Sequence, residues 1–97
     1  MIARVWRGAA ATPANADAYE DHVRTRVLPA LGAIAGYRGA RVLRRGLEFV
    51  VITQWESMDA VRRFAGDEPE AAVVEPEARA VLSEFEEVVR HYDVVAQ

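Results

Sequence analysis

The two histidines of the sequence, His22 and His91, are the side chains that could accept a proton near neutral pH. His22 lies one position before Val23 of an apolar stripe, about 100° around a helix, and so on the flank of that stripe. A flank histidine is usually partly exposed, but it becomes a candidate base if a cavity opens beside it. His91 shares a strand face with Asp93, which could polarise the imidazole or simply hydrogen-bond to it. Both histidines are candidate catalytic bases, and for both a structural role is the alternative.

Aromatic and basic side chains supply candidate contacts for a ligand. Trp6 offers a wide ring and one hydrogen-bond donor, which suit a wall against a planar molecule, whereas a core or interface tryptophan is the alternative. Tyr19 and Phe64 lie on helical patterns and are further candidates for stacking. Arg4 and Arg38 could stabilise a phenolate or a carboxylate, although arginines on strands often pair with acids or face solvent. We take these five residues as candidate substrate-binding residues.

Several classes of function are disfavoured by what the sequence lacks. It has no cysteine nucleophile, no glycine-rich phosphate loop and no GxSxG motif, and its two histidines are too far apart in the chain to suggest a metal site. The net charge of −3 and the scattered arginines disfavour nucleic-acid binding. No apolar run approaches the roughly 20 residues that span a bilayer. We expect a cytoplasmic protein without a targeting signal, a metal or a membrane contact.

The elements that must position these residues begin with a strand and a helix. The 97 residues, of which 52% are apolar, suit one domain over residues 1–97. A first strand is expected at Ile2–Arg7, and Thr12 followed by Pro13 predicts the start of a helix. Pro29 disfavours helical geometry at the residue before it, so this helix should kink or stop there. Its apolar stripe consists of Tyr19, Val23 and Val27.

The rest of the chain alternates between strand and helix patterns. Two strand-like runs flank Gly46, which predicts a hairpin. Ser57 then caps a helix that should run to about Ala65 and end at Gly66. The acidic, alanine-rich segment from Asp67 to Glu87 predicts one or two short helices before a last strand. The three strands are expected at Tyr37–Arg45, Leu47–Trp55 and Val88–Val95.

This βαββαβ order is that of a ferredoxin-like α+β domain, an antiparallel sheet with both helices on one face and the first and third strands at its centre. The third strand places Phe49, Val51 and Trp55 on one face but Val50 and Ile52 on the other, so both faces are apolar. Because helices can cover only one face, the second predicts a homodimer joined through its sheet faces. A half-solvated sheet face is the alternative.

Four segments together resemble the antibiotic-biosynthesis-monooxygenase family: Met1–Arg7, the hairpin after Gly36, the stretch Ser57–Gly66 and the closing His91–Val95. The resemblance implies a dimeric α/β barrel, in which two sheets face each other and a small-molecule pocket lies between each sheet and its helices. Haem-degrading relatives use a histidine in the region of the second helix, and Met58–Glu87 contains none. We therefore expect no haem here.

The resemblance also implies a function: a cofactor-independent monooxygenase that acts on an electron-rich aromatic molecule such as a quinol or an anthrone. Such a substrate, once deprotonated, can itself pass an electron to oxygen, so no cofactor is needed and the protein supplies a base and stabilises an anion. In this role His22 is the first candidate base and His91 the second. The alternatives are a non-catalytic, ligand-binding or regulatory dimer of the same fold and a purely structural partner.

Overall fold

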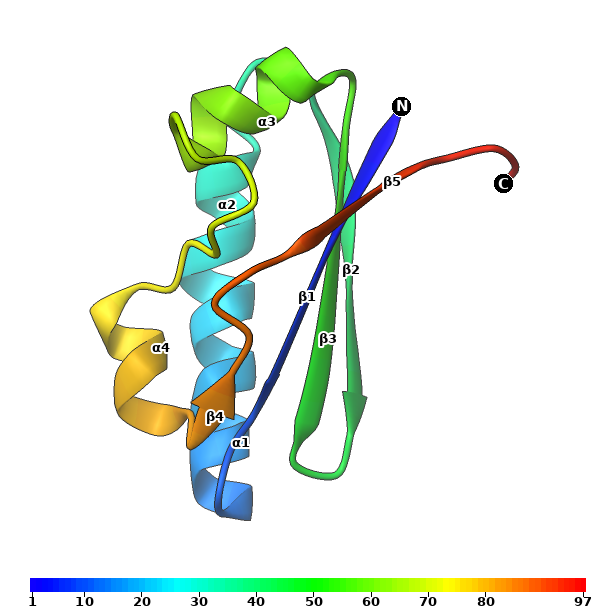
Figure 1. Ribbon diagram of the computed structural model, residues 1–97. Helices are drawn as coiled ribbons and strands as arrows, with labels where there is room; N and C mark the ends of the chain where they lie inside the picture. Colours follow the sequence, from blue (N-terminus) through cyan, green and yellow to red (C-terminus); the bar gives the residue numbers. More distant parts are fainter.

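The computed structural model describes residues 1–97 as one open antiparallel sheet with the helices on one side of it (Figure 1). The strand order is β2-β3-β1-β4, and β5 also pairs with β1, so the expected α+β, ferredoxin-like fold is confirmed and β1 and β3 are central. The sheet is not closed into a barrel within the chain. The elements are β1 (Ile2–Ala9), α1 (Pro13–His22), η1 (Val23–Val27), α2 (Leu28–Leu31), β2 (Tyr37–Arg45), β3 (Glu48–Trp55), α3 (Met58–Ala65), α4 (Pro76–Val81), β4 (Glu84–Phe85) and β5 (Arg90–Asp93).

Strand alternation divides the sheet between a face under the helices and an outer face. On β1 and β3 the helix-side residues are paired directly, with Trp6 opposite Val51 and Arg4 opposite Thr53. Neighbouring residues in a register pair share a face, so this row of side chains lies between the sheet and the helices. The buried helix-side residues of the two central strands are Arg4, Trp6, Gly8, Phe49, Thr53 and Trp55.

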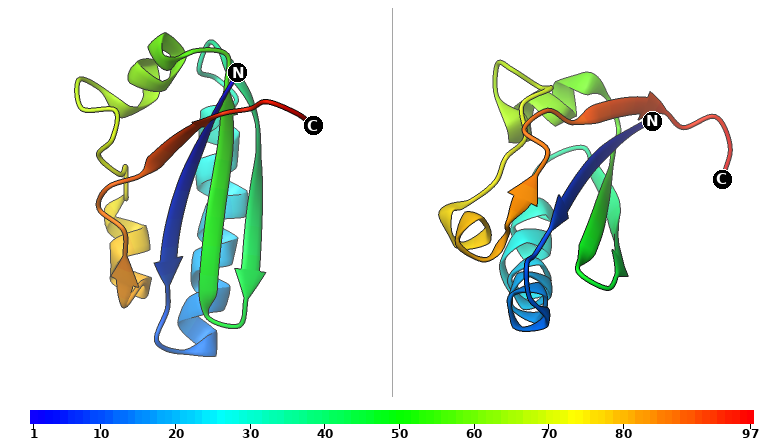
Figure 2. Two further views of the ribbon diagram at one scale, coloured as in Figure 1. Left: turned by 45° about the vertical axis from the view of Figure 1, so that its right-hand side comes forward. Right: turned by 60° about the horizontal axis from the view of Figure 1, so that its bottom comes forward.

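No helix covers the outer face of the sheet, as both views in Figure 2 show. Val5 lies opposite Ile52 there, and Arg7 lies opposite Val50. The two faces of β3 therefore divide as its sequence predicts. None of the helices contains an apolar stretch of the length that a bilayer span requires. The outer face carries Ala3, Val5, Arg7, Arg41, Leu43, Val50, Ile52, Gln54, Arg90 and Tyr92.

The first helix starts as expected but does not stop at its proline. Thr12 caps α1 and Pro13 occupies its first turn. Instead of ending near Pro29, the helix passes through one π-helical turn, η1, and continues as α2. The Leu28 N–H bonds to the carbonyl of Val23, five residues back. This wider turn accommodates a proline, which has no N–H and would crowd a carbonyl of a regular α-helix. The predicted stop at Pro29 does not occur, and the regular α-helix is instead interrupted by η1 just before the proline.

The hairpin and the second helix have the expected signals. β2 and β3 meet at Gly46, whose φ of +62° is a conformation that glycine adopts without strain. The Ser57 hydroxyl caps α3 by accepting a hydrogen bond from the Ala60 N–H at 3.2 Å. Gly66 ends this helix with a φ of +85°. The short helix expected in the acidic segment is α4, which packs against α1.

The last strand is shorter than expected and is divided in two. The structure has a two-residue β4 and then β5 at Arg90–Asp93, in place of one strand over Val88–Val95. Between them the chain leaves β1 and pairs with the segment before α4. The Ala72 N–H donates to the Glu87 carbonyl at 2.8 Å, and the Val89 N–H donates to the Glu70 carbonyl at 2.8 Å. These bonds satisfy backbone groups that a continuous strand would have placed against β1.

Candidate functional site

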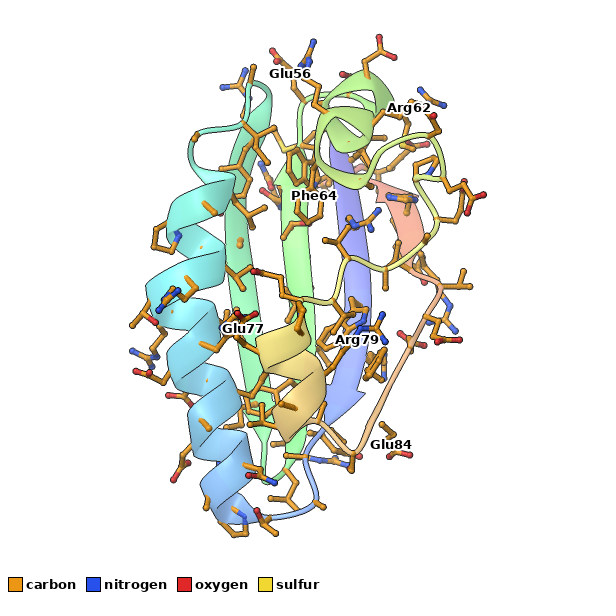
Figure 3. The ribbon with its side chains drawn as sticks, turned by 90° about the vertical axis from the view of Figure 1, so that its left-hand side faces the viewer. Glu56, Arg62, Phe64, Glu77, Arg79 and Glu84 are labelled. Carbon is orange, nitrogen blue, oxygen red and sulfur yellow. The ribbon has the colours of Figure 1, made fainter.

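A cavity of about 90 Å³ lies between the helical layer and the sheet. α1, η1 and α2 form one wall and β1 and β3 form the opposite one. Phe64 of α3 lies at one end, near the sheet (Figure 3), and residues 73–75 with α4 close the side toward solvent. Most of the lining is apolar, so a ligand would exchange water for hydrocarbon and aromatic contacts. The lining residues are Arg4, Trp6, Tyr19, His22, Val27, Leu31, Val51, Thr53, Phe64, Val73, Val74, Glu75, Ala78 and Val89.

His22, at the end of α1, brings a free nitrogen to this cavity. Its side chain is 10% exposed, less than its flank position predicts, because α4 packs over α1 at this point. Its Nε2 atom is buried and has no hydrogen-bond partner. The nearest opposite charge is the Glu75 carboxylate, whose Oε1 lies 3.8 Å from Nε2 and whose side chain is 51% exposed. A buried nitrogen without a partner is available to a ligand hydroxyl.

His91 lies behind Arg4 and outside the cavity lining. Arg4 is buried, and its Nη1 lies 3.0 Å from His91 Nε2 and also donates to the Pro69 carbonyl, while Nη2 donates to the Ala71 carbonyl at 2.8 Å. Arg4 is always a donor, so His91 Nε2 must be the acceptor and the ring proton must be on Nδ1. Burial lowers the pKa of Arg4 to about 10, although the nearby negative charge of Glu70 acts to raise it. Burial, and then the Arg4 charge, lower the pKa of His91.

Aromatic rings form the deep wall of the cavity. The Trp6 and Tyr19 ring centroids are 5.9 Å apart, and Tyr19 meets Phe49 edge-on at 4.7 Å. The Trp6 Nε1–H donates to the Glu86 carbonyl at 2.9 Å, which fixes the ring plane. Gly8 makes room for this ring, since a Cβ there would lie 2.5 Å from Trp6 Cη2. Burial raises the pKa of Tyr19, so its hydroxyl stays protonated at neutral pH.

Phe64 closes the other end of the cavity through contacts with both a cation and an aromatic ring. The Arg4 guanidinium carbon lies 5.5 Å from the Phe64 ring centroid. Phe64 also stacks on Trp55, with centroids 5.4 Å apart. Trp55 is fully buried, and its Nε1–H donates to the Thr53 hydroxyl at 2.8 Å. Thr53 itself faces the cavity.

The structure brings five of the seven candidate residues to one cavity: Arg4, Trp6, Tyr19, His22 and Phe64. His91 contacts Arg4 and does not line the cavity. Arg38 lies elsewhere, where its exposed Nη2 pairs with Glu56 Oε1 at 2.8 Å. Sequence reasoning missed Glu75, which has no periodic pattern around it. The protein contains no group of three or more histidine, cysteine or acidic side chains that could hold a metal ion.

Comparisons with known proteins agree with this architecture. The model of the family described as Antibiotic biosynthesis monooxygenase matches residues 3–76. SnoaB, a cofactor-independent oxygenase from Streptomyces nogalater, is 19% identical with a TM-score of 0.66, over 99% of this chain and 94% of that chain. NE2512, a protein of unknown function from Nitrosomonas europaea, is 20% identical with a TM-score of 0.75, over 99% of this chain and 90% of that chain.

A third similar structure is the monooxygenase from the gene ActVA-Orf6 of Streptomyces coelicolor, solved with the ligand Nanaomycin D. It is 23% identical with a TM-score of 0.57, and the match covers 70% of this chain but only 62% of that one, less than two thirds. No curated protein matches the chain. At these identities the similarity to solved structures shows the fold.

Proposed function

Because the chain belongs to the antibiotic biosynthesis monooxygenase family, whose model matches residues 3–76, we propose that it is a cofactor-independent monooxygenase of an electron-rich aromatic molecule such as a quinol or an anthrone. The observation that carries this proposal is the buried, unpartnered Nε2 of His22 on the wall of an apolar, aromatic-lined cavity. A base in such a place can take a proton from a bound aromatic molecule without competition from water.

His22 begins the reaction by accepting a proton from the substrate at Nε2. The resulting aromatic anion is electron-rich and passes an electron to oxygen itself. For an anthrone, the methylene carbon loses its two hydrogens, one oxygen atom becomes the new carbonyl oxygen and the other leaves as water. The substrate supplies all the electrons, so the reaction needs no external reductant.

The other cavity residues hold the substrate and its charge. Trp6 and Tyr19 present ring surfaces to a planar molecule, and Phe64 limits its length at the other end. Arg4 has both terminal nitrogens engaged by the protein, so it stabilises the anion through its charge from the wall and not through a direct hydrogen bond.

Access for a substrate is expected at the side closed by residues 73–75. The cavity of about 90 Å³ is smaller than the roughly 300–1,000 Å³ of typical ligand pockets. Val73 lines the cavity and is also 48% exposed, so this segment joins the cavity to solvent. A ring system therefore enters here by displacing the segment, or binds with one ring inside.

Oxygen uptake by the purified, metal-free protein tests the proposal. We expect at least one member of a panel of quinols and anthrones to be oxidised faster than in buffer. His22→Gln should lower kcat/KM by about a hundredfold or more, since a positioned base contributes roughly that much. His91→Gln is the matched control, because it replaces the second histidine and keeps an acceptor toward Arg4.

Each outcome of this experiment has a definite meaning. If no panel member is consumed above the rate in buffer, the enzyme proposal fails for this substrate class. If His22→Gln keeps full activity, His22 is not the base. The small volume of the cavity favours one other function, a ligand-binding or regulatory protein, for which a phenolic ligand would raise the melting temperature without oxygen consumption.

We also propose that the protein works as a homodimer joined through the outer faces of its two sheets. The support is the apolar outer face, which no helix covers, and the absence of any disulfide that would stabilise so small a chain. The cavity lies on the opposite face of the sheet, so each subunit would keep its own site.

A further inference from the structure

The carboxylate of Glu75 faces His22 across the mouth of the cavity. The two residues come from different elements, since His22 ends α1 and Glu75 immediately precedes α4. Glu75 Oε1 lies 3.8 Å from His22 Nε2, and both residues line the cavity. The Nε2 atom has no other polar partner. The pair is therefore the only contact between opposite charges inside the cavity when His22 carries a proton.

Hydrogen bonds from Arg79 restrain the backbone at Glu75. Glu75 is the N-cap residue of α4, yet its side chain makes no capping hydrogen bond and stays available to His22. The Arg79 N–H donates to the Glu75 carbonyl at 3.0 Å, and Arg79 Nε donates to the Val74 carbonyl at 3.1 Å. Two hydrogen bonds from Arg79 therefore restrain the peptide groups on both sides of the Glu75 Cα atom.

No other group in the cavity can balance a charge on His22. The remaining ionisable residues of its lining are Arg4 on β1, which is already positive, and Tyr19 on α1, whose raised pKa keeps it neutral. The charged residues next to His22 along its helix point away from the cavity: Asp21, Arg24 and Arg26 are exposed, and Glu20 pairs with Arg24 and Arg44. On α4, Glu77 is exposed and does not line the cavity.

We propose that Glu75 is the positioning residue of the His22 base, so that the two form a proton-accepting pair for a hydroxyl-bearing aromatic ligand. Neutral His22 accepts the ligand proton at Nε2, and Glu75 stabilises the imidazolium that this transfer creates in apolar surroundings. The ligand then stays in the cavity as an anion beside Arg4. This inference deepens the proposed function, on which it rests for the site and the class of ligand.

A chromogenic phenol tests the pair without any oxidation. 4-Nitrophenol absorbs at longer wavelength as the anion than as the neutral phenol, so the spectrum of the bound ligand reports where the proton is. We expect the wild-type protein to bind it largely as the anion under slightly acidic conditions. Glu75→Gln should lower the ratio of bound anion to bound neutral phenol about tenfold, because it removes an opposite charge within about 4–6 Å of the base.

Two controls separate charge from packing. 4-Nitroanisole has no proton to give, so its affinity should be the same for the wild-type protein and Glu75→Gln. Glu77→Gln removes a nearby acid of α4 that is outside the cavity, and it should leave the bound 4-nitrophenol spectrum unchanged.

The proposal is overturned if Glu75→Gln binds 4-nitrophenol as the anion to the same extent as the wild-type protein, if the wild-type protein binds only the neutral phenol, or if it binds none. Equal losses of affinity for both ligands in Glu75→Gln would reduce Glu75 to a packing role and overturn it as well. Oxygen uptake is measured separately. An ionised bound phenol without any oxygen uptake would support the pair and contradict the monooxygenase.

Discussion

Arg4 is a buried cation that no carboxylate contacts directly. Its two terminal nitrogens are satisfied by the Pro69 and Ala71 carbonyls and by His91 Nε2. Buried charges need such complete hydrogen bonding, because the cost of removing them from water is large. The same bonds join β1, β5 and the segment before α4, and so fix one wall of the cavity. His91 serves this arrangement only in its neutral form, because a proton on Nε2 would face the Arg4 donor.

We predict that His91 makes the protein less stable in acid. Burial and Arg4 lower the pKa of His91 in the folded state below the ordinary value of 6.5. Below that ordinary value the unfolded chain binds more protons than the folded one, so stability falls as the pH falls. His91→Gln keeps an acceptor toward Arg4 but cannot titrate. The urea midpoint should drop less between about pH 8 and about pH 5 in His91→Gln than in the wild-type protein. Equal drops would contradict this role for His91.

Residue types and strand or helix periodicity predicted much of the site, and the exceptions have local causes. Trp6 and Arg4 share a strand face, so strand alternation alone places them together. Arg38 lies four residues before Val42 on β2, so strand alternation alone would place it on the same face, toward the helices. A register shift between Tyr37 and Gly39 instead turns Tyr37 toward the helices and leaves Arg38 exposed. Glu75 could not be found from the sequence, since its position depends on how α4 packs against α1.

At the scale of elements, the π-helical turn η1 keeps one face of the long helix on the cavity. In an α-helix four residues turn through about 400°, so a stripe at four-residue steps drifts by about 40° at each step. Over the three steps from Tyr19 to Leu31 this drift would carry Leu31 off the cavity face. A π turn rotates less per residue and reverses part of the drift. Tyr19, Val27 and Leu31 consequently all line the cavity.

We predict that deletion of Thr25, an exposed residue of η1, destabilises the protein more when Pro29 is present than when it is replaced. Removing one residue should convert the π turn to an α turn and leave the proline inside a regular helix, at a cost of about 3 kcal/mol. In the Pro29→Ala background that cost is absent. Urea unfolding of the four proteins measures the difference as a double-mutant cycle. If the deletion costs the same in both backgrounds, Pro29 is not the reason for η1.

Elements with local signals were predicted more closely than those fixed by distant contacts. The β2–β3 hairpin and α3 have a turn glycine and a serine cap within their own sequence. By contrast, a proline usually ends a helix, but the π turn η1 accommodates Pro29 within the helix. The division of the last strand into β4 and β5 follows from hydrogen bonds to residues 70–72, far away in sequence. No pattern within Val88–Val95 carries that information.

At the scale of the whole molecule, the uncovered outer face of the sheet is the feature that a single chain leaves unexplained. Val5, Val50 and Ile52 form its apolar centre and are partly exposed, while Leu43 is 49% exposed and Tyr92 is 53% exposed. Around this centre lie Arg7, Arg41 and Arg90. An apolar centre with a charged rim is the pattern of a protein interface, and it is the surface on which the proposed dimer would form.

We predict that a charge at the centre of this face separates the proposed dimer. Ile52→Glu would bury a carboxylate at the centre of the proposed interface, where the second subunit contributes the same charge. It should raise the dissociation constant of the dimer by about thirtyfold or more, the effect of losing a central contact worth about 2 kcal/mol. Ala18→Glu, on the exposed face of α1, is the matched control and should leave assembly unchanged. Light scattering at micromolar concentration measures both, and circular dichroism checks that Ile52→Glu still folds. A wild-type protein that is monomeric there, or an Ile52→Glu variant that stays dimeric, would show that this face is not the interface.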